Sequence, residues 1–206
     1  MVVRVLRQVE KASLVSRALV ATDSEQVAAV VRDFGGQVVL TSDAHRTGTD
    51  RIAEAAAGLP GDLFVNIQGD EPLIEPTVVD RLVAAFADPT VDVVTASAPL
   101  LEDQDNPSRV KVVVSNFGRA LYFSRVAIPF GGPWRLHVGV YGFRRRALAH
   151  FATMPQSELE RIERLEQLRF LESGLKIQVV EVDCGSISVD TEPDLRRVRG
   201  MVRARS

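Results

Sequence analysis

An acidic turn follows a short apolar run in the first half of the chain, and this stretch strongly limits the possible folds. Residues 63–67 are mostly apolar, as in a strand buried on both faces of a parallel sheet. Asp70 and Glu71 follow, and Pro72 ends the strand because proline has no N–H to donate. Since ligands of open α/β sheets bind beyond the carboxyl ends of the strands, Asp70 lies where a ligand site is expected.

Asp190 has a similar setting near the other end of the sequence. It follows an expected short strand at 187–189 and precedes Thr191, which can cap a helix. Aspartates from two strand ends could share a hard cation such as Mg²⁺, with waters and substrate phosphates completing the site. The simpler interpretation is a solvated turn at Asp70 and helix capping at Asp190, and spacing alone favours it.

The first hundred residues alternate between helical and strand patterns. Helices are expected at 1–9, 25–34, 50–57 and 76–86, and strands at 18–22, 37–40, 63–67 and 91–98. This alternation predicts an α/β fold with a Rossmann-like, mostly parallel sheet and helices on both faces. The whole chain, 1–206, is expected to form a single domain.

The second half has a different pattern. Residues 110–123 indicate a hairpin with Gly118 in its turn, and the segment 107–143 is expected to be a small antiparallel insertion on one edge of the sheet. Ser157 and Glu160 form a capping-box pattern that opens one helix, which is expected to end at Gly174. A strand at 176–182 and a helix after Thr191 complete the expected elements.

Composition excludes several classes of function. The formal net charge of -2 gives no reason to expect nucleic acid or an anionic membrane as a partner. Cys184 is the only cysteine, which fits a reducing cytoplasm, and no apolar stretch is long enough to insert into a membrane. Hydrolase motifs such as G-x-S-x-G and H-E-x-x-H are absent, and three scattered histidines make a zinc site unconvincing.

Several motifs together resemble the 3-deoxy-manno-octulosonate cytidylyltransferases, the CMP-KDO synthetases. They occur in the family's order at 20–23, 45–51, 65–72, 121–125, 128–129, 137–142, 165–169 and 189–195, over essentially the whole chain. The resemblance implies a Mg²⁺-dependent nucleotidyltransferase that transfers CMP from CTP to 3-deoxy-manno-octulosonate (KDO) and releases pyrophosphate. It also implies a product used in lipopolysaccharide synthesis, and a homodimer with the hairpin region at the contact.

The same resemblance implies roles for individual residues. Asp70 and Asp190 would hold Mg²⁺ and help to orient the sugar hydroxyl for attack on the α-phosphorus. The CTP pocket would be lined by His45, Thr47, Gly48, Thr49, Asp50 and Arg51. The KDO site would be lined by Gln68, Arg125, His137, Tyr141, Glu166 and Gln167. Arg125 could pair with the KDO carboxylate through two hydrogen bonds. For His137 and Tyr141, the residues taken without the resemblance favour ordinary core positions.

The sequence also departs from the family pattern in two places. Family members open with a strand and a basic, glycine-containing loop that holds the triphosphate, and neither precedes the helix expected at 1–9. The connection 130–135 is shorter than the family's usual loop. From the first departure we expect a chain that is poorly active or inactive. A related synthetase for another acidic sugar, such as an acylneuraminate, and an inactive dimer-forming homologue remain alternatives, although the motifs at 137–141 and 166–167 favour KDO.

Overall fold

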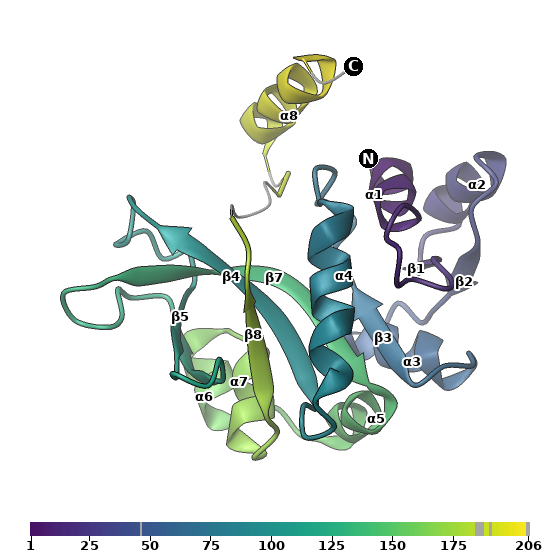
Figure 1. Ribbon diagram of the computed structural model, residues 1–206. Helices are drawn as coiled ribbons and strands as arrows, with labels where there is room; N and C mark the ends of the chain where they lie inside the picture. The colour runs from purple at the N-terminus through teal and green to yellow at the C-terminus, as the bar shows by residue number, and fades with distance from the viewer. Residues whose placement is uncertain (46, 184–187, 190, 205–206) are drawn as a thin grey trace.

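The computed structural model describes residues 1–45, 47–183, 188–189 and 191–204 (Figure 1). The helices are α1 (Val2–Val9), α2 (Glu25–Asp33), α3 (Gly48–Ala57), α4 (Pro76–Ala84), the 3₁₀ turn η1 (Ala85–Ala87), α5 (Arg145–Thr153), α6 (Glu158–Glu163), α7 (Gln167–Glu172) and α8 (Glu192–Ala204). The strands are β1 (Val20–Thr22), β2 (Val38–Leu40), β3 (Leu63–Asn66), β4 (Val93–Leu100), β5 (Lys111–Val114), β6 (Ala120–Ser124), β7 (Trp134–Arg144) and β8 (Ile177–Glu181). The predicted α/β class is confirmed.

A six-stranded sheet forms the centre of the molecule. Five of its strands have the order β6-β5-β7-β4-β8, and β3 pairs with Tyr141 to Arg144 of β7, beyond the part of β7 that pairs with β5. Most strands share one direction, namely β3, β4, β5 and β8, whereas β6 and β7 run in the opposite direction. The pairs that β7 makes with β3, β4 and β5 are therefore antiparallel. β1 and β2 form a separate parallel pair, and α3 contacts both β1 and β3.

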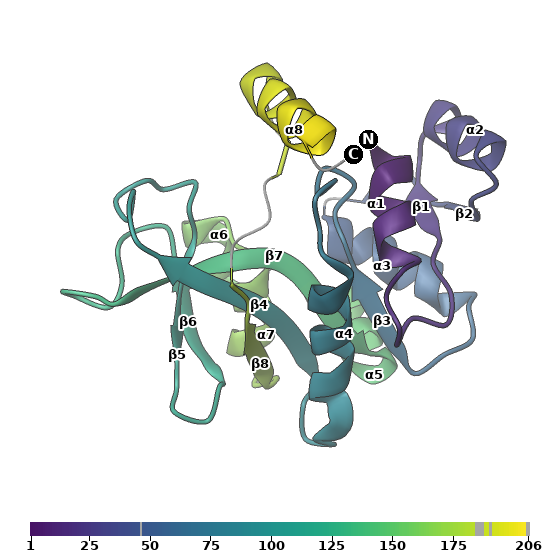
Figure 2. The ribbon, with the colours of Figure 1, turned by 45° about the horizontal axis from the view of Figure 1, so that its top comes forward.

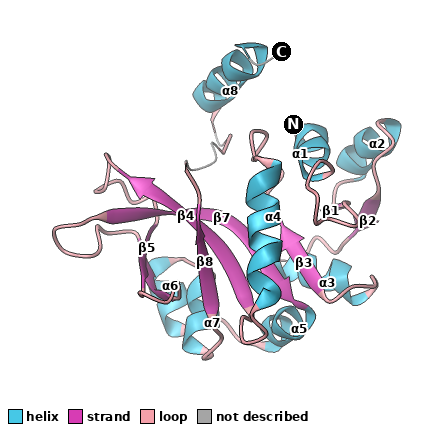
Figure 3. Ribbon diagram, in the orientation of Figure 1, coloured by secondary structure: helices cyan, strands magenta, loops and turns pink. Residues whose placement is uncertain are grey.

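Helices cover both faces of this sheet, as the alternation predicted (Figures 2 and 3). One apolar cluster joins the sheet to α5 and α7 and includes the rings of Phe143, Phe151 and Phe170. The other joins it to α1 and α4 and includes Val5 and Leu82. No helix in the described ranges is long and apolar enough to cross a membrane.

β7 occupies a different place from the one expected for the segment 107–143. It pairs with β3, β4 and β5 in the interior of the sheet, and only the β5–β6 hairpin lies at an edge. The second half of β7 is apolar. Val140 and Phe143 are fully buried there, in the two apolar clusters on opposite faces of the sheet. Burial on both faces is typical of a central strand, so the expectation of an edge insertion was wrong for β7.

The single helix expected from Ser157 to Gly174 is also wrong, because the structure has two short helices there. Ser157 and Glu160 form the predicted capping box at the start of α6. Arg164 then adopts a left-handed conformation, with φ 55° and ψ 47°, and the chain turns before α7. Ile162, near the end of α6, is 68% exposed. Helix α5 was not predicted at all.

Candidate active site

The acidic turn follows β3 as predicted. The main-chain carbonyl of Asp70 accepts a 2.9 Å hydrogen bond from the N–H of Val189. The residue before Asp190 therefore lies beside Asp70, although Asp190 itself is outside the described residues. The described Val189 is not part of a strand, so the strand expected at 187–189 does not extend to it.

Mg²⁺ binding by Asp70 and Asp190 stays a prediction. Within the described ranges, no group of three or more histidine, cysteine or acidic side chains is arranged to hold a metal. Asp70 carries carboxylate oxygens, which are the donors that Mg²⁺ prefers, and Val189 lies beside it.

The predicted CTP residues lie at the start of α3. Thr47 is the N-cap: its Oγ1 accepts from the N–H of Asp50 at 3.2 Å and donates to the Asp50 carboxylate at 3.0 Å. Gly48 and Thr49 therefore belong to the first turn of the helix, which begins two residues earlier than expected. Thr49 is fully buried, so the helix rather than a free loop fixes the direction of its hydroxyl.

Two further predicted CTP residues are held by acidic partners. Arg51 donates to Asp23 at 2.8 Å and to the hydroxyl of Thr41 at 2.7 Å. The hydrogen bond from Arg51 lowers the pKa of the Asp23 carboxyl. His45 pairs with Glu54, and this hydrogen bond lowers the pKa of Glu54. These contacts tie the residues after β1 and β2 to α3.

Glu166 connects the predicted CTP residues to the predicted KDO residues. Its Oε1 accepts a 2.6 Å hydrogen bond from the hydroxyl of Thr49, which lies 117 positions earlier in the sequence. The other oxygen, Oε2, is buried and has no hydrogen-bond partner among the described residues. Burial raises the pKa of Glu166, while the hydrogen bond from Thr49 opposes that effect. A buried carboxyl with one oxygen still available suits an active site.

Gln68 and Gln167 lie close to this junction. A Cβ atom on Gly48 would lie 3.1 Å from Nε2 of Gln68, so the start of α3 packs directly on that side chain. Gln167 follows Glu166 as the first residue of α7 and is buried. Both residues were predicted in the KDO site, and their roles there stay predictions.

His137 and Tyr141 extend the site along β7. The His137 ring lies 5.0 Å from the Phe123 ring and 5.5 Å from the Tyr141 ring, and its Nε2 is 3.0 Å from the hydroxyl of Thr95. Burial lowers the pKa of His137 to about 3, so the imidazole is neutral at physiological pH. Burial, with the nearby Glu166 charge, raises the pKa of the Tyr141 hydroxyl well above its usual range.

We expect replacement of His137 by Gln to change how stability depends on pH. The unfolded imidazole takes up a proton as the pH falls below 6.5, whereas the folded one resists protonation until about pH 3. The histidine therefore costs stability progressively as the pH falls through this window, by about 2 kcal/mol between pH 7 and pH 5. Urea unfolding at both pH values should show that His137→Gln loses correspondingly less stability on acidification.

His150, which is exposed on α5, provides the matched control for this experiment. His150→Gln should retain the pH dependence of the unmodified chain. If His137→Gln and the unmodified chain lose the same stability between pH 7 and pH 5, the burial of a neutral imidazole at His137 is contradicted.

Arg125 has structural partners that sequence reasoning did not anticipate. Three of its N–H groups donate to main-chain carbonyls, those of Glu163 at 2.8 Å, Pro107 at 3.0 Å and Arg164 at 3.1 Å. Glu163 also accepts from the N–H of Arg125 at 3.1 Å and from the Ser124 hydroxyl at 2.8 Å. Arg125 thus holds the turn between α6 and α7, and its pairing with a KDO carboxylate stays a prediction.

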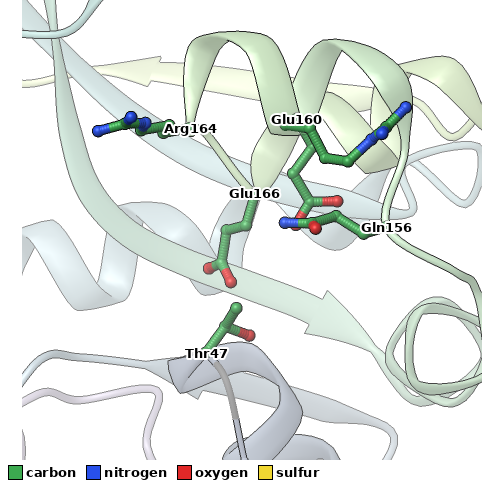
Figure 4. Close-up of a pocket in the computed structure, with 6 residues that line it drawn as sticks. Thr47, Gln156, Glu160, Arg164 and Glu166 are labelled. Carbon is green, nitrogen blue, oxygen red and sulfur yellow. The ribbon is translucent and has the colours of Figure 1, made fainter.

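A cavity of about 430 Å³ opens where α6, α7 and the start of α3 meet. Its lining residues are Thr47, Gln156, Glu160, Arg161, Arg164 and Glu166. Figure 4 shows the carboxylate of Glu166 directed toward Thr47, with Glu160 and Gln156 beside it. Sequence reasoning missed four of these six residues, because it placed 157–174 in one continuous helix and so gave no reason for the turn at Arg164 to face a cavity.

Comparisons with known proteins identify the family of this chain. Residues 1–177 match the cytidylyltransferase family. The chain is 45% identical to the 3-deoxy-manno-octulosonate cytidylyltransferase of Chlorobaculum parvum over 100% of this chain and 88% of the relative. It is 47% identical to the enzyme of that name from Geobacter metallireducens, over 96% of this chain and 85% of the relative.

The fold agrees with a solved structure as well. CMP:2-keto-3-deoxy-manno-octonic acid synthetase, complexed with CTP, is 35% identical to this chain and superposes with a TM-score of 0.95, covering 98% of this chain and 87% of that protein. A 4-diphosphocytidyl-2C-methyl-D-erythritol synthase from Anaerococcus prevotii, at 10% identity and a TM-score of 0.66, shares only the fold. The chain belongs to the 3-deoxy-manno-octulosonate cytidylyltransferase family.

Proposed function

We propose that this chain transfers CMP from CTP to KDO, with release of pyrophosphate. The observation that carries the proposal is the hydrogen bond between Thr49 and Glu166. It joins the residues assigned to CTP to those assigned to KDO, so the two substrates would meet at one place. The names of the relatives at 45% and 47% identity support the same reaction. A CMP-activated sugar acid of this kind would supply lipopolysaccharide synthesis in the cytoplasm.

The described residues suit attack by a sugar hydroxyl on the α-phosphorus of CTP. Glu166 has a buried oxygen that can accept a hydrogen bond from a sugar hydroxyl. His137, held neutral, can hydrogen-bond to another hydroxyl without adding charge. Asp70, with Asp190, would hold Mg²⁺, which supplies charge neutralisation for the phosphates when it is bound.

Pyrophosphate release tests the proposal. We expect release only when CTP, KDO and Mg²⁺ are all present, and we expect EDTA to stop it. Equal release without KDO would mean that the chain hydrolyses CTP, and no release with all three components would contradict the proposed reaction.

We also propose that the chain forms a homodimer. The side chains of Leu101, Val126 and Phe130 are 91%, 66% and 104% exposed, and Val126 and Phe130 lie in the connection between β6 and β7. Apolar side chains this open to water favour burial against another protein surface. Light scattering should give the mass of two chains, and Phe130→Asp should shift the mass toward that of one. A monomeric unmodified chain would contradict the proposal.

A further inference from the structure

The register of β7 against β4 shifts after Thr95, beside His137. Thr95 lies opposite Tyr141, and the next residue of β4 lies opposite Val138. Residues 139–140 of β7 therefore have no counterpart among the described residues of β4, and such a bulge bends the strand that contains the extra residues. Residues four positions apart in a regular strand are separated by about 13 Å, whereas the rings of His137 and Tyr141 lie 5.5 Å apart. The bulge thus allows these two rings to be neighbours.

The hydroxyl of Thr95 connects this bulge to the His137 ring. Thr95 is fully buried, and its Oγ1 lies 2.9 Å from the carbonyl oxygen of Val140 and 3.3 Å from that of Val138. The same Oγ1 lies 3.0 Å from Nε2 of His137. One side chain on β4 therefore contacts both the backbone of the bulge and the imidazole.

These three contacts determine which nitrogen of His137 carries the proton. A threonine hydroxyl has one proton and two lone pairs, and a carbonyl oxygen can only accept. The proton of Thr95 therefore goes to a carbonyl of the bulge, and Oγ1 accepts a hydrogen bond from Nε2–H of His137. The reverse arrangement would direct the lone pairs of Oγ1 at two carbonyl oxygens. Because burial lowers the pKa of His137 to about 3, the ring is neutral at physiological pH and carries only this proton.

The other ring nitrogen, Nδ1, is then a hydrogen-bond acceptor. It makes no hydrogen bond to any residue that the structure describes, and His137 keeps part of its surface accessible. Glu166 lies close enough for its charge to act on the Tyr141 hydroxyl, and it also has an oxygen without a partner in the described part of the chain. Two acceptors in one region suit a ligand that presents hydroxyl groups.

We infer that Thr95 is a positioning residue, which fixes the bulge of β7 and holds His137 with its proton on Nε2. Nδ1 of His137 then accepts a hydrogen bond from a hydroxyl of the sugar. The contact with the sugar rests on the proposed function, whereas the role of Thr95 concerns the chain alone and holds with or without a substrate.

NMR of the chain labelled with ¹⁵N-histidine tests the position of the proton directly. The chain has three histidines, and the signals of His137 are those missing from the spectrum of His137→Gln. Couplings between the ring nitrogens and the carbon-bound ring protons distinguish the Nε2–H form from the Nδ1–H form. We expect only the Nε2–H form at pH 7. Thr95→Val keeps the shape of the side chain without its hydroxyl, and we expect the Nδ1–H form to become populated in this variant.

Kinetics with the same variants test the contact with the sugar. Thr95→Val should raise the KM for KDO by about 3- to 10-fold, as for loss of one neutral hydrogen bond, while the KM for CTP stays unchanged. Thr95→Ser keeps the hydroxyl and should restore both the Nε2–H form and the KM. Thr77→Val makes the same change at an exposed position of α4 and should behave as the unmodified chain does.

The outcomes separate the two parts of the inference. The Nδ1–H form in the unmodified chain would overturn the role of Thr95, even if Thr95→Val did not fold, and so would an unchanged Nε2–H form in folded Thr95→Val. A changed tautomer with an unchanged KM for KDO would overturn the contact between Nδ1 and the sugar. If the unmodified chain does not use KDO, the proposed function fails together with that contact, and the NMR spectrum still decides the role of Thr95.

Discussion

Replacement of Asp70 by Asn is expected to lower kcat by about a thousandfold, because several kcal/mol of charge stabilisation by the metal would be lost. Asn keeps the shape of the side chain but offers one neutral amide oxygen in place of a carboxylate. The fold should persist, since the contact of Asp70 with Val189 uses the main-chain carbonyl. The direct measurement is kcat over a Mg²⁺ titration, with unfolding by urea as the check on folding.

Asp103 offers the same substitution away from the site. It is exposed and has φ 57°, a conformation that Asn also tolerates. Asp103→Asn should retain full activity and the Mg²⁺ dependence of the unmodified chain. An Asp70→Asn variant that keeps kcat within tenfold, with unchanged Mg²⁺ dependence, would show that Asp70 does not hold the metal.

The buried ion pair between Glu160 and Arg169 is expected to dominate the stability of the region around the cavity. The two side chains are 3% and 9% exposed, and the Arg169 guanidinium also lies 4.1 Å from the centre of the Phe151 ring. Arg169→Met would leave the Glu160 carboxylate buried without its cation. We expect the free energy of unfolding to fall by about 3–5 kcal/mol, measured by urea denaturation.

The double variant Glu160→Met/Arg169→Met separates the ion pair from simple loss of packing. It should be more stable than Arg169→Met alone, because no charge remains buried. Arg196→Met removes the cation of an exposed pair with Glu192, whose side chains are 73% and 60% exposed, and should change stability by less than about 0.5 kcal/mol. A double variant less stable than Arg169→Met would contradict this account.

Local sequence patterns were sufficient for the elements whose partners are close in the chain. The helix–strand alternation predicted α1 to β3 in order, and Ser157 with Glu160 predicted the start of α6. The turn at Arg164 was not predictable in this way. Arg favours helix, and its left-handed conformation is held by Arg125, which is 39 positions away. The position of β7 inside the sheet was not predicted either, because it depends on pairing with β3 and β4, which are far from β7 in the sequence.

The candidate site shows the same limit. Motifs located Thr49 and Glu166 separately, but no spacing rule joins residues 117 positions apart. The partners of Arg125 are carbonyls from two distant loops, so its structural role was invisible to a motif. Arg164 lines the cavity at the break between α6 and α7, and the sequence carries no glycine or proline at the break.

The most direct test of the central claim uses CTP with a radioactive α-phosphorus. The chain is given this CTP together with equal amounts of KDO and N-acetylneuraminate, and the labelled product is identified. We predict that the label appears in a KDO product and that this transfer needs Mg²⁺. Transfer mainly to N-acetylneuraminate would assign the chain to another acidic sugar. Transfer to neither sugar would contradict the claim that this chain is an active cytidylyltransferase for KDO.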